Sequence, residues 1–306
     1  MKRTIKLLIR RYIAYSVPRI FRRKLPKTIT RHFYFDGIVK FNVTPNTKLK
    51  MLSQGLLLEN ELHWYGLEGY HEKLSMKIWI EFIKIMQPKV ILDIGANTGI
   101  YGLVAKSIAP TSSSVIFFEP IPRAVSILEK NLIQNKFKAK VLNLALSDYD
   151  GEGFYNLEVG KDIAYSITIN DFADRAISGI HNDSISYEKL QTKVARIDTL
   201  IDLGLISIPD LIKLDVETLE PNVLAGFGES LSNNMSFLCE VLTWEIAEKL
   251  NNIFEGSEYC FYNIDDQKNS LRKTQQIEKS DFWNYFICKR EIADKLPILN
   301  LLRSDS

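Results

Sequence analysis

The hydrophobic positions of the chain alternate between helical and strand spacing from about residue 72 onward. Leu74, Ile78 and Phe82 recur on one helical face before Pro88, so a helix is expected over about 72–86. Similar patterns predict further helices at 100–108, 122–135 and 220–227, and short apolar strands at 89–94, 115–118, 141–146, 211–216, 237–242 and 285–288. Strands in alternation with helices are typical of an α/β protein whose parallel sheet is covered on both faces.

Two regions do not follow this alternation. Residues 36–70 are mixed in polarity and rich in turn residues, and we expect short strands there that lead into the core. Residues 151–194 have short alternating pieces, such as Ala164–Ile169, and a polar run at His181–Ser184. A hairpin or lid over the site and an ordinary surface insertion explain this second region equally well.

Residues 1–35 form a distinct segment, which we call the basic head. Ile5, Leu8 and Tyr12 fall on one face of a helix that should end before Pro18, with basic residues on the other face. Arg10 and its basic neighbours interrupt any apolar run, so we expect neither a secretory signal nor a membrane span. Two kinds of partner stay open: an anionic lipid surface, or the chain's own domain or a second subunit.

Charge is unevenly distributed between the basic head and the rest of the chain. The 306 residues include 39 Lys and Arg and 37 Asp and Glu. Eleven of the basic residues and none of the acidic ones lie in the basic head, so the remaining chain holds 28 basic against 37 acidic residues, a net charge of −9. This acidic body argues against nucleic acid as a partner.

The overall composition is that of an ordinary folded protein. Hydrophobic residues make up 46% and charged residues 25% of the chain, which excludes disordered and collagen-like classes. The three cysteines, Cys239, Cys260 and Cys288, lie in apolar runs without a Cys-x-x-Cys pair. We therefore expect buried free thiols in a reducing compartment.

The first motif with candidate chemistry is a strand that ends in a glycine-bearing turn, Val90–Gly99. Gly95 and Gly99 let the backbone approach a ligand that a Cβ would block, and Asp93 and Asn97 add polar side chains at the strand end. The turn lacks both the Gly-x-Gly-x-x-Gly spacing of dinucleotide sites and the Gly-Lys-Ser/Thr of phosphate loops. It therefore favours a ligand with hydroxyl, amine and carboxylate groups over a pyrophosphate.

Further carboxylates follow other predicted strands. Glu119 ends the next strand, where a Rossmann-like sheet presents a carboxylate to a ribose diol. Asp215 and Glu217 follow a later strand and favour a functional role, whereas capping of the next helix explains Glu220 equally well. Glu240 lies in an otherwise apolar strand, so we expect it at the strand tip or beside a ligand, Lys or Arg.

Together these motifs resemble the FkbM-type methyltransferases, class I enzymes that use S-adenosylmethionine. The resemblance extends from about Gly69 to Lys289, and its motifs are Gly69–Glu72, Asp93–Gly99, Glu119–Pro120, Leu214–Glu217, Glu220–Pro221 and Asn284–Phe286. Thr218 stands where the family commonly has Gly. The resemblance implies a Rossmann-like class I methyltransferase fold, with a mostly parallel seven-stranded sheet, helices on both faces and, here, a basic N-terminal helical extension.

The resemblance also implies which residues bind the cofactor. The residues that would surround its methionine, ribose and adenine are Asp93, Gly95, Asn97, Gly99, Glu119, Pro120, Ser147, Asp148 and Asp215. Of these, Glu119 would accept hydrogen bonds from the ribose hydroxyls, and Ser147 and Asp148 would meet the adenine.

The remaining acids are candidates for catalysis. Asp215 and Glu217 would lie near the sulfonium and the acceptor hydroxyl, and either is our first candidate for the general base, with Glu240 and His71 behind them. Asp215, Glu217 and Glu240 would also suit Mg²⁺, but nothing in their spacing demands a metal.

We therefore expect an S-adenosylmethionine-dependent methyltransferase that acts on a hydroxyl of a sugar, a glycan or another small metabolite. Two other classes stay open: a non-catalytic cofactor-binding scaffold at a membrane, and a nicotinamide-dependent oxidoreductase, which the missing pyrophosphate glycines disfavour. We expect a cytoplasmic location, with the basic head as a means of peripheral contact with the inner face of the membrane. The expected segments are the basic head (1–35), a lead-in (36–70), the methyltransferase domain (71–290) and a C-terminal tail (291–306).

Overall fold

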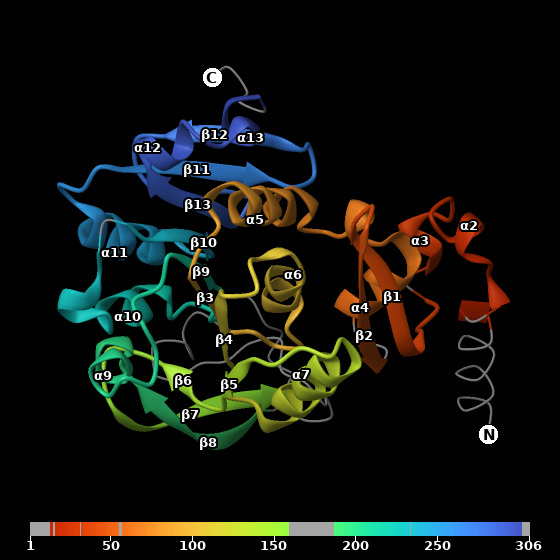
Figure 1. Ribbon diagram of the computed structural model, residues 1–306, viewed down its shortest axis with the longest axis horizontal. Coiled ribbons are helices and arrows are strands. Elements are labelled where there is room, and N and C mark those ends of the chain that lie inside the picture. The colour runs from red at the N-terminus through yellow and green to blue at the C-terminus, as the bar shows by residue number, and fades with distance from the viewer. Residues whose placement is uncertain are drawn as a thin grey trace.

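The computed structural model describes residues 13–14, 16–30, 32–54, 57–158, 187–232 and 234–301. Its centre is an eight-stranded sheet with the order β12-β11-β13-β10-β9-β3-β4-β5 (Figure 1). In chain order these strands are β3 (Val90–Ile94), β4 (Ser114–Phe118), β5 (Lys140–Leu142), β9 (Leu211–Leu214), β10 (Ser236–Glu240), β11 (Tyr259–Asp265), β12 (Ser270–Thr274) and β13 (Asn284–Lys289).

The sheet is parallel through its middle and antiparallel at one side. β5, β4, β3, β9 and β10 pair in parallel, whereas β13 lies antiparallel between β10 and β11. The described sheet has one strand more than the expected seven, because β12 adds to the edge of β11. The sequence of β12 is mostly polar, so no run of apolar residues predicts this strand. The predicted α/β sheet is confirmed, and Cys239, Cys260 and Cys288 are buried free thiols within it.

Helices cover both faces of the sheet (Figure 1). On one face lie α5 (Lys73–Met86), α6 (Ile100–Ile108) and α7 (Pro122–Gln134), and on the other α9 (Ile197–Asp202), α10 (Glu220–Ala225) and α11 (Trp244–Phe254). Each layer of helices packs on the sheet through its own apolar core. The predicted helices at 72–86, 100–108, 122–135 and 220–227 are present, whereas α9 and α11 were not predicted.

The chain after β13 packs back onto α5. It forms α12 (Arg290–Ala293) and α13 (Pro297–Leu301). Leu296 and Leu299 are fully buried, and the Ile298 amide donates to a Glu81 carboxylate oxygen at 2.8 Å. These residues therefore contribute to the same core as α5.

The lead-in forms a hairpin and a helix beside the main sheet. Its elements are β1 (Asp36–Thr44), β2 (Thr47–Gln54), α4 (Leu57–Tyr65) and a 3₁₀ turn at Leu67–Gly69, and β1 and β2 pair antiparallel. This confirms the short strands expected there. The lead-in also supports the glycine turn, because the Thr98 hydroxyl donates to the buried Glu59 of α4 at 2.6 Å.

The described part of the basic head contacts α4. It includes α2 (Arg19–Arg22) and α3 (Lys27–Thr30). The carbonyl oxygen of Ala14 lies 3.1 Å from Nε2 of His63, whose Nδ1 lies 3.2 Å from the Arg22 guanidinium. The predicted helix around residues 5–13 lies almost entirely outside the described residues. Within the described ranges, no helix has the length and apolar character needed to cross a membrane.

A second, three-stranded sheet lies at the bottom of the view in Figure 1. It consists of β6 (Ala145–Leu146), β7 (Gly151–Glu158) and β8 (Tyr187–Ala195), of which β7 and β8 form an antiparallel hairpin. The pieces Ala164–Ile169 and His181–Ser184 lie outside the described residues. The strand expected at 141–146 is divided between the two sheets, because Asn143 turns the chain by donating to the carbonyls of Glu119 and Pro120 at 2.8 and 3.0 Å.

Candidate active site

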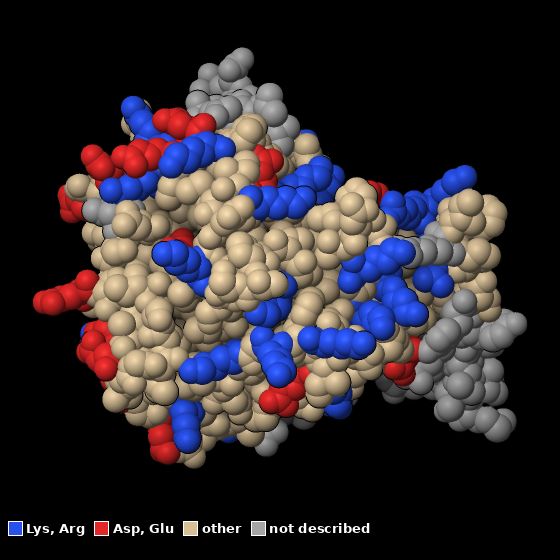
Figure 2. Space-filling view, viewed as in Figure 1, with Lys and Arg blue, Asp and Glu red and all other residues tan. Residues whose placement is uncertain are grey.

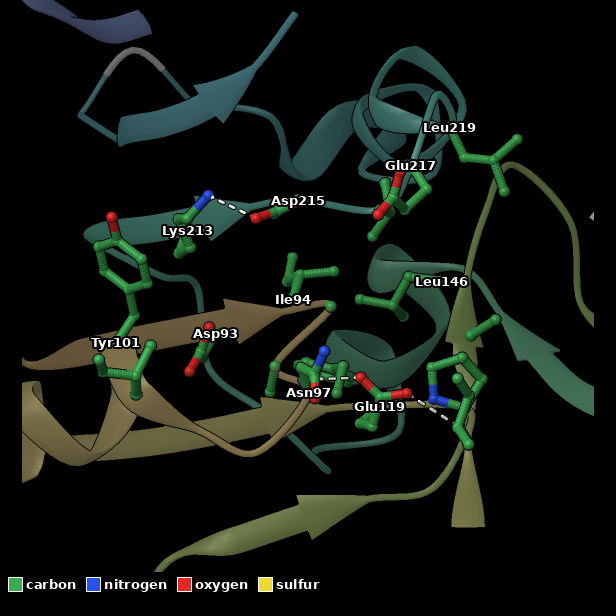
Figure 3. A pocket seen from close by; sticks show the side chains of 18 of the residues that line it. Asp93, Ile94, Asn97, Tyr101, Glu119, Leu146, Lys213, Asp215, Glu217 and Leu219 are labelled. Carbon is green, nitrogen blue, oxygen red and sulfur yellow. Dashed lines mark hydrogen bonds and ion pairs between the residues drawn. The ribbon is translucent and has the colours of Figure 1, made fainter. Parts of the chain in front are cut away.

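The carboxyl ends of β3, β4 and β9 meet at one cavity (Figure 3). Ligands bind at this edge of open α/β sheets because the loops leaving neighbouring strands diverge there. The expected site residues that line the cavity are His71, Asp93, Gly95, Asn97, Glu119, Pro120, Asp215 and Glu217. The structure thus brings together residues from four separate segments of the sequence.

The glycine turn after β3 joins two strand ends. Gly95 has a φ of 75°, and a Cβ at this position would lie 1.7 Å from the carbonyl oxygen of Asp215, so only glycine fits. The amides of Gly95 and Ala96 both donate to the carbonyl oxygen of Phe118, each at 3.0 Å. These contacts fix the turn between the ends of β4 and β9.

Glu119 is bound to the same turn. Its two carboxylate oxygens accept hydrogen bonds from the amides of Asn97 at 2.7 Å and Ile121 at 2.9 Å. Burial raises the pKa of Glu119 to about 7. Each carboxylate oxygen has room for a second hydrogen bond, which is the contact expected from ribose hydroxyls. The side-chain oxygen of Asn97 is buried and has no partner among the described residues, so a ligand donor would satisfy it.

Asp93 and Gly99 hold α6 in place. An Asp93 carboxylate oxygen accepts from the Gly102 amide at 2.7 Å, and burial raises the pKa of Asp93 to about 7. Gly99 was expected to contact the cofactor, but it is not among the described residues that line the cavity. Its φ is 93°, and a Cβ there would lie 2.2 Å from Cδ1 of Leu128 on α7. Close packing of α6 and α7 therefore explains this glycine.

The side of the cavity expected to bind adenine is lined by the residues just before Ser147 and Asp148. Ser147 donates to Asp148 at 3.0 Å, and Asp148 accepts from Asn222 at 3.2 Å, but neither is among the described lining residues. The chain leaves the central sheet at residue 143, and the side chains of residues 144–146 then line the cavity. The lining here is apolar: Leu144, Ala145, Leu146, Val216 and Leu219. Such a surface suits a flat, largely apolar ring.

The turn after β9 concentrates carboxylates around a buried cation. A carboxylate oxygen of Asp215 lies 3.0 Å from the ammonium of Lys213 (Figure 3). Lys213 itself is only 1% exposed. Glu217 and Thr218 have φ values of 54° and 87°, a strained conformation for the β-branched threonine. Burial, with the negative charges of Asp215 and Glu220, raises the pKa of Glu217 to about 8. A carboxyl group with this pKa would exchange a proton near neutral pH.

The two remaining acids of this region, Glu220 and Glu240, are not among the described residues that line the cavity. Glu220 is fully buried and accepts from the Val216 amide at 3.1 Å, so it stabilises the turn before α10. Glu240 is the last residue of β10, as expected. Burial, together with the charges of Asp215 and Glu217, raises the pKa of Glu240 well above its usual range.

His71 lines the cavity at its outer side. Its Nδ1 lies 2.8 Å from a Glu61 carboxylate oxygen and its Nε2 lies 4.0 Å from Glu72. Burial alone lowers the pKa of His71, but Glu61 and Glu72 raise it by more, so the net shift is upward. Two neighbouring carboxylates thus favour the protonated form of the ring, which is the form that cannot accept a proton.

The sequence analysis gave no role to four further polar residues of the lining: Tyr70 and Glu72, which lie in the Gly69–Glu72 motif, and Tyr101 and Lys213. Lys213 could have been noticed, since a cation inside an apolar strand requires a partner. Among the residues that the structure describes, no cluster of three or more His, Cys, Asp or Glu is arranged to hold a metal ion. The ammonium of Lys213 lies among the acids that we considered for Mg²⁺.

Comparison with known proteins gives one family. A model described as "Methyltransferase FkbM domain" matches residues 93–303. AMB antimetabolite synthetase AmbE of Pseudomonas aeruginosa is 29% identical over 236 residues, which cover 68% of this chain and 11% of AmbE. The 31-O-demethyl-FK506 methyltransferase FkbM of Streptomyces tacrolimicus is 26% identical over 164 residues, which cover 47% of this chain and 61% of that protein.

A comparison of folds finds methyltransferases as well. The crystal structure of methyltransferase FkbM from Methylobacillus flagellatus matches with a TM-score of 0.39 and 15% sequence identity, over 65% of this chain and 44% of that one. The chain thus spans less than two thirds of each of these relatives.

Proposed function

This chain belongs to the FkbM family of S-adenosylmethionine-dependent methyltransferases, and from that premise we propose that it methylates a hydroxyl group of a sugar or another small metabolite. The supporting observation is that one cavity joins the glycine turn and Glu119 to the acids after β9. Gly95 and the Asp215 carbonyl lie too close for any side chain between them. A cofactor on the turn and a proton acceptor after β9 are therefore neighbours.

The lining fits S-adenosylmethionine group by group. Glu119 would accept from the ribose hydroxyls, the unpartnered oxygen of Asn97 would accept from a cofactor donor, and the apolar side would enclose the adenine. When bound, the cofactor supplies an electrophilic methyl group on a sulfonium. The residues of this chain contribute chiefly by holding the two reactants in line, which is the largest part of catalysis for such a displacement.

The acids after β9 would receive the proton of the acceptor. As the new O–C bond forms and the S–C bond breaks, the hydroxyl proton passes to a carboxylate of the enzyme. Glu217 lines the cavity and has a pKa of about 8, which suits a base near neutral pH. Asp215 is the alternative, although its carboxylate is already paired with the ammonium of Lys213 at 3.0 Å.

The two alternatives from sequence have less support. A nicotinamide-dependent oxidoreductase would need a pyrophosphate site. The Asn97 amide of the turn after β3 instead donates to the Glu119 carboxylate, and Asp215 and Glu217 line the same cavity. A scaffold that only binds the cofactor would not require an acid with a raised pKa beside it.

Binding and turnover test the proposal together. We would titrate the protein calorimetrically with S-adenosylmethionine, S-adenosylhomocysteine and NAD, and then follow transfer of a labelled methyl group to a panel of methyl glycosides. We expect binding of the first two ligands, none of NAD, and label in the glycoside fraction. Glu119→Gln should weaken binding about a hundredfold, whereas Glu129→Gln on the exposed side of α7 should not change it. Binding without transfer to any acceptor would favour the scaffold, and binding of NAD alone would refute the proposal.

We further propose that the basic head makes peripheral contact with an anionic membrane. Ile20 and Phe21 are 73% and 54% exposed, and Lys and Arg side chains gather over this end of the molecule (Figure 2). Apolar side chains beside cations are typical of interfacial binding. Cosedimentation with phosphatidylserine vesicles should fall several-fold in Phe21→Ser and be unchanged in Phe154→Ser, which alters an exposed Phe on β7. Equal binding of both variants would refute this contact.

A further inference from the structure

One end of the cavity contains buried polar groups that the proposed contacts of the cofactor with Glu119, Asn97 and the apolar side leave unused. Tyr101 is 4% exposed and lines the cavity, yet its hydroxyl has no hydrogen-bond partner among the described residues. Figure 3 shows Tyr101 and Lys213 on one side of the cavity, with Glu119 and Leu146 on the other. A buried hydroxyl without a hydrogen-bond partner destabilises the protein. A ligand at this end would remove that destabilisation.

Both donors and acceptors line the cavity together with Tyr101. The ammonium of Lys213 lies 5.0 Å from the centre of the Tyr101 ring and 3.0 Å from Asp215. Its hydrogen bond to Asp215 uses one of its three N–H groups. Glu72 also lines the cavity and accepts from the Tyr70 hydroxyl at 3.0 Å and the Asn284 amide at 2.6 Å.

The charges of this end limit the kind of ligand that fits. Burial opposes ionisation of Glu72, but the positive charge of Lys213, with smaller contributions from His71, Asn284 and Tyr70, lowers its pKa. One buried cation therefore faces the carboxylates of Asp215 and Glu72. A carboxylate or phosphate on the acceptor would be repelled by this excess of acids, and an apolar group would leave the polar atoms unpaired. A neutral group that both donates and accepts satisfies them.

We infer that Tyr101, Lys213 and Glu72 form an acceptor subsite that binds a hydroxyl next to the one that is methylated, so that the substrate class is a neutral compound with vicinal hydroxyls, as in a saccharide ring. This inference rests on the proposed function and specifies its acceptor. Each sugar hydroxyl both donates and accepts a hydrogen bond, as the mixed donors and acceptors of this end require. A site built to pair with a hydroxyl discriminates strongly against an analogue that lacks it.

The test removes the Tyr101 hydroxyl and the matching hydroxyl of the acceptor separately and together. Saturation-transfer NMR on the S-adenosylhomocysteine complex identifies which methyl glycosides of glucose, mannose, galactose and rhamnose bind, and labelled S-adenosylmethionine gives their KM and kcat. Tyr101→Phe should raise the KM for the bound glycoside at least tenfold and leave the Kd of S-adenosylmethionine within twofold. A deoxy glycoside lacking the neighbouring hydroxyl should show the same loss in the wild type and no further loss in Tyr101→Phe, because paired groups are not additive.

The control makes the same chemical change elsewhere. Tyr259→Phe deletes a hydroxyl that donates to the carbonyls of Ser232 and Met235, away from the cavity, and should leave the glycoside KM unchanged. If no glycoside binds although S-adenosylmethionine does, or if Tyr101→Phe behaves like Tyr259→Phe, the subsite is refuted while the methyltransferase assignment stands. If S-adenosylmethionine itself does not bind, the proposed function fails instead.

Discussion

The ammonium of Lys213 lies 3.0 Å from a carboxylate oxygen of Asp215, although Lys213 is in the middle of an apolar strand and is 1% exposed. Burial on its own would lower the pKa of this lysine, but the charges of Asp215, Glu72 and Glu240 reverse that effect and raise it. One cation therefore offsets several acids that come from different strands and helices. The charge state of the whole cavity depends on it.

Lys213→Met should destabilise the fold strongly. The substitution preserves the volume of the stem but leaves the carboxylates of Asp215 and Glu72 without their buried counter-charge, which typically costs about 3–5 kcal/mol. Urea unfolding followed by circular dichroism measures the loss. Lys249→Met is the control, since Lys249 pairs with Glu245 at 3.0 Å with both side chains about half exposed, and such pairs contribute about 0–1 kcal/mol. Similar losses in the two variants would contradict the role given to Lys213.

The rate of methyl transfer should rise with pH through about 8. Burial and the neighbouring acids raise the pKa of Glu217 to about 8, and a general base acts only in its deprotonated form. Below that pH, kcat/KM should therefore increase about tenfold per pH unit, and above it the profile should level off. Glu217→Gln should lose roughly a hundredfold in rate together with the inflection. An inflection that survives in Glu217→Gln would transfer the role of base to another group, with Asp215 first.

Stability of the protein without cofactor should fall as pH rises from about 4 to 8. Burial raises the pKa values of Asp93, Glu119 and Glu220 to about 7, and burial with nearby charges raises that of Glu217 to about 8. The folded state then holds protons that the unfolded chain has already released, so their stabilisation is complete below the unfolded pKa of about 4 and is lost progressively from there through pH 7–8.

Thermal unfolding across this pH range measures the effect. The expected loss is about 1.4 kcal/mol per pH unit for each proton that the folded state holds in excess. In the double variant Glu119→Gln, Glu217→Gln, two of the four titrating carboxyl groups are replaced by amides that do not titrate. The stability of this variant should therefore change less with pH. A steeper or an unchanged dependence in the double variant would show that other groups control it.

Much of this site could be predicted because its residues follow directly from strands. Asp93, Glu119 and Asp215 each come at the end of an apolar run, and the carboxyl ends of parallel strands meet at one edge of the sheet. The same logic requires the strand at 141–146 to be continuous before Ser147 and Asp148, which are not among the described residues that line the cavity. Asn143 hydrogen bonds to the chain after β4 instead and turns the strand away.

Other features depend on contacts that are distant in the sequence. Glu72 precedes α5 and meets Lys213 only because α5 packs against β13 and β11. Gly99 could equally have served a ligand or a neighbouring helix, and only the position of Leu128 decides between them. The edge strand β12 is polar, so no periodic signal distinguishes it from a loop.

Gly95→Ala should abolish cofactor binding, whereas Gly204→Ala should not. Both glycines have a left-handed backbone, with φ values of 75° and 66°, so both substitutions add strain of about 1–2 kcal/mol. At Gly95 the new Cβ would also lie 1.7 Å from the Asp215 carbonyl oxygen, while at Gly204 nothing lies within 4 Å. The difference isolates the close approach of β3 and β9. Calorimetric titration with S-adenosylmethionine should show at least a hundredfold loss in the first variant only, and equal affinities would contradict this account of the turn.

Thr218→Gly should stabilise the protein. Thr218 has a φ of 87°, in the left-handed region that a β-branched residue strongly disfavours, and its hydroxyl is buried without a partner among the described residues. Glycine removes both costs at a position where the FkbM family commonly has it, and the expected gain is about 1 kcal/mol after the higher entropy of the unfolded chain is subtracted. Thr199→Gly within α9 should do the reverse, because glycine weakens a helix and this hydroxyl donates to Asp150 at 2.7 Å. Denaturant unfolding compares the two, and a loss of stability in Thr218→Gly would mean that the threonine methyl or hydroxyl makes a compensating contact in the folded protein.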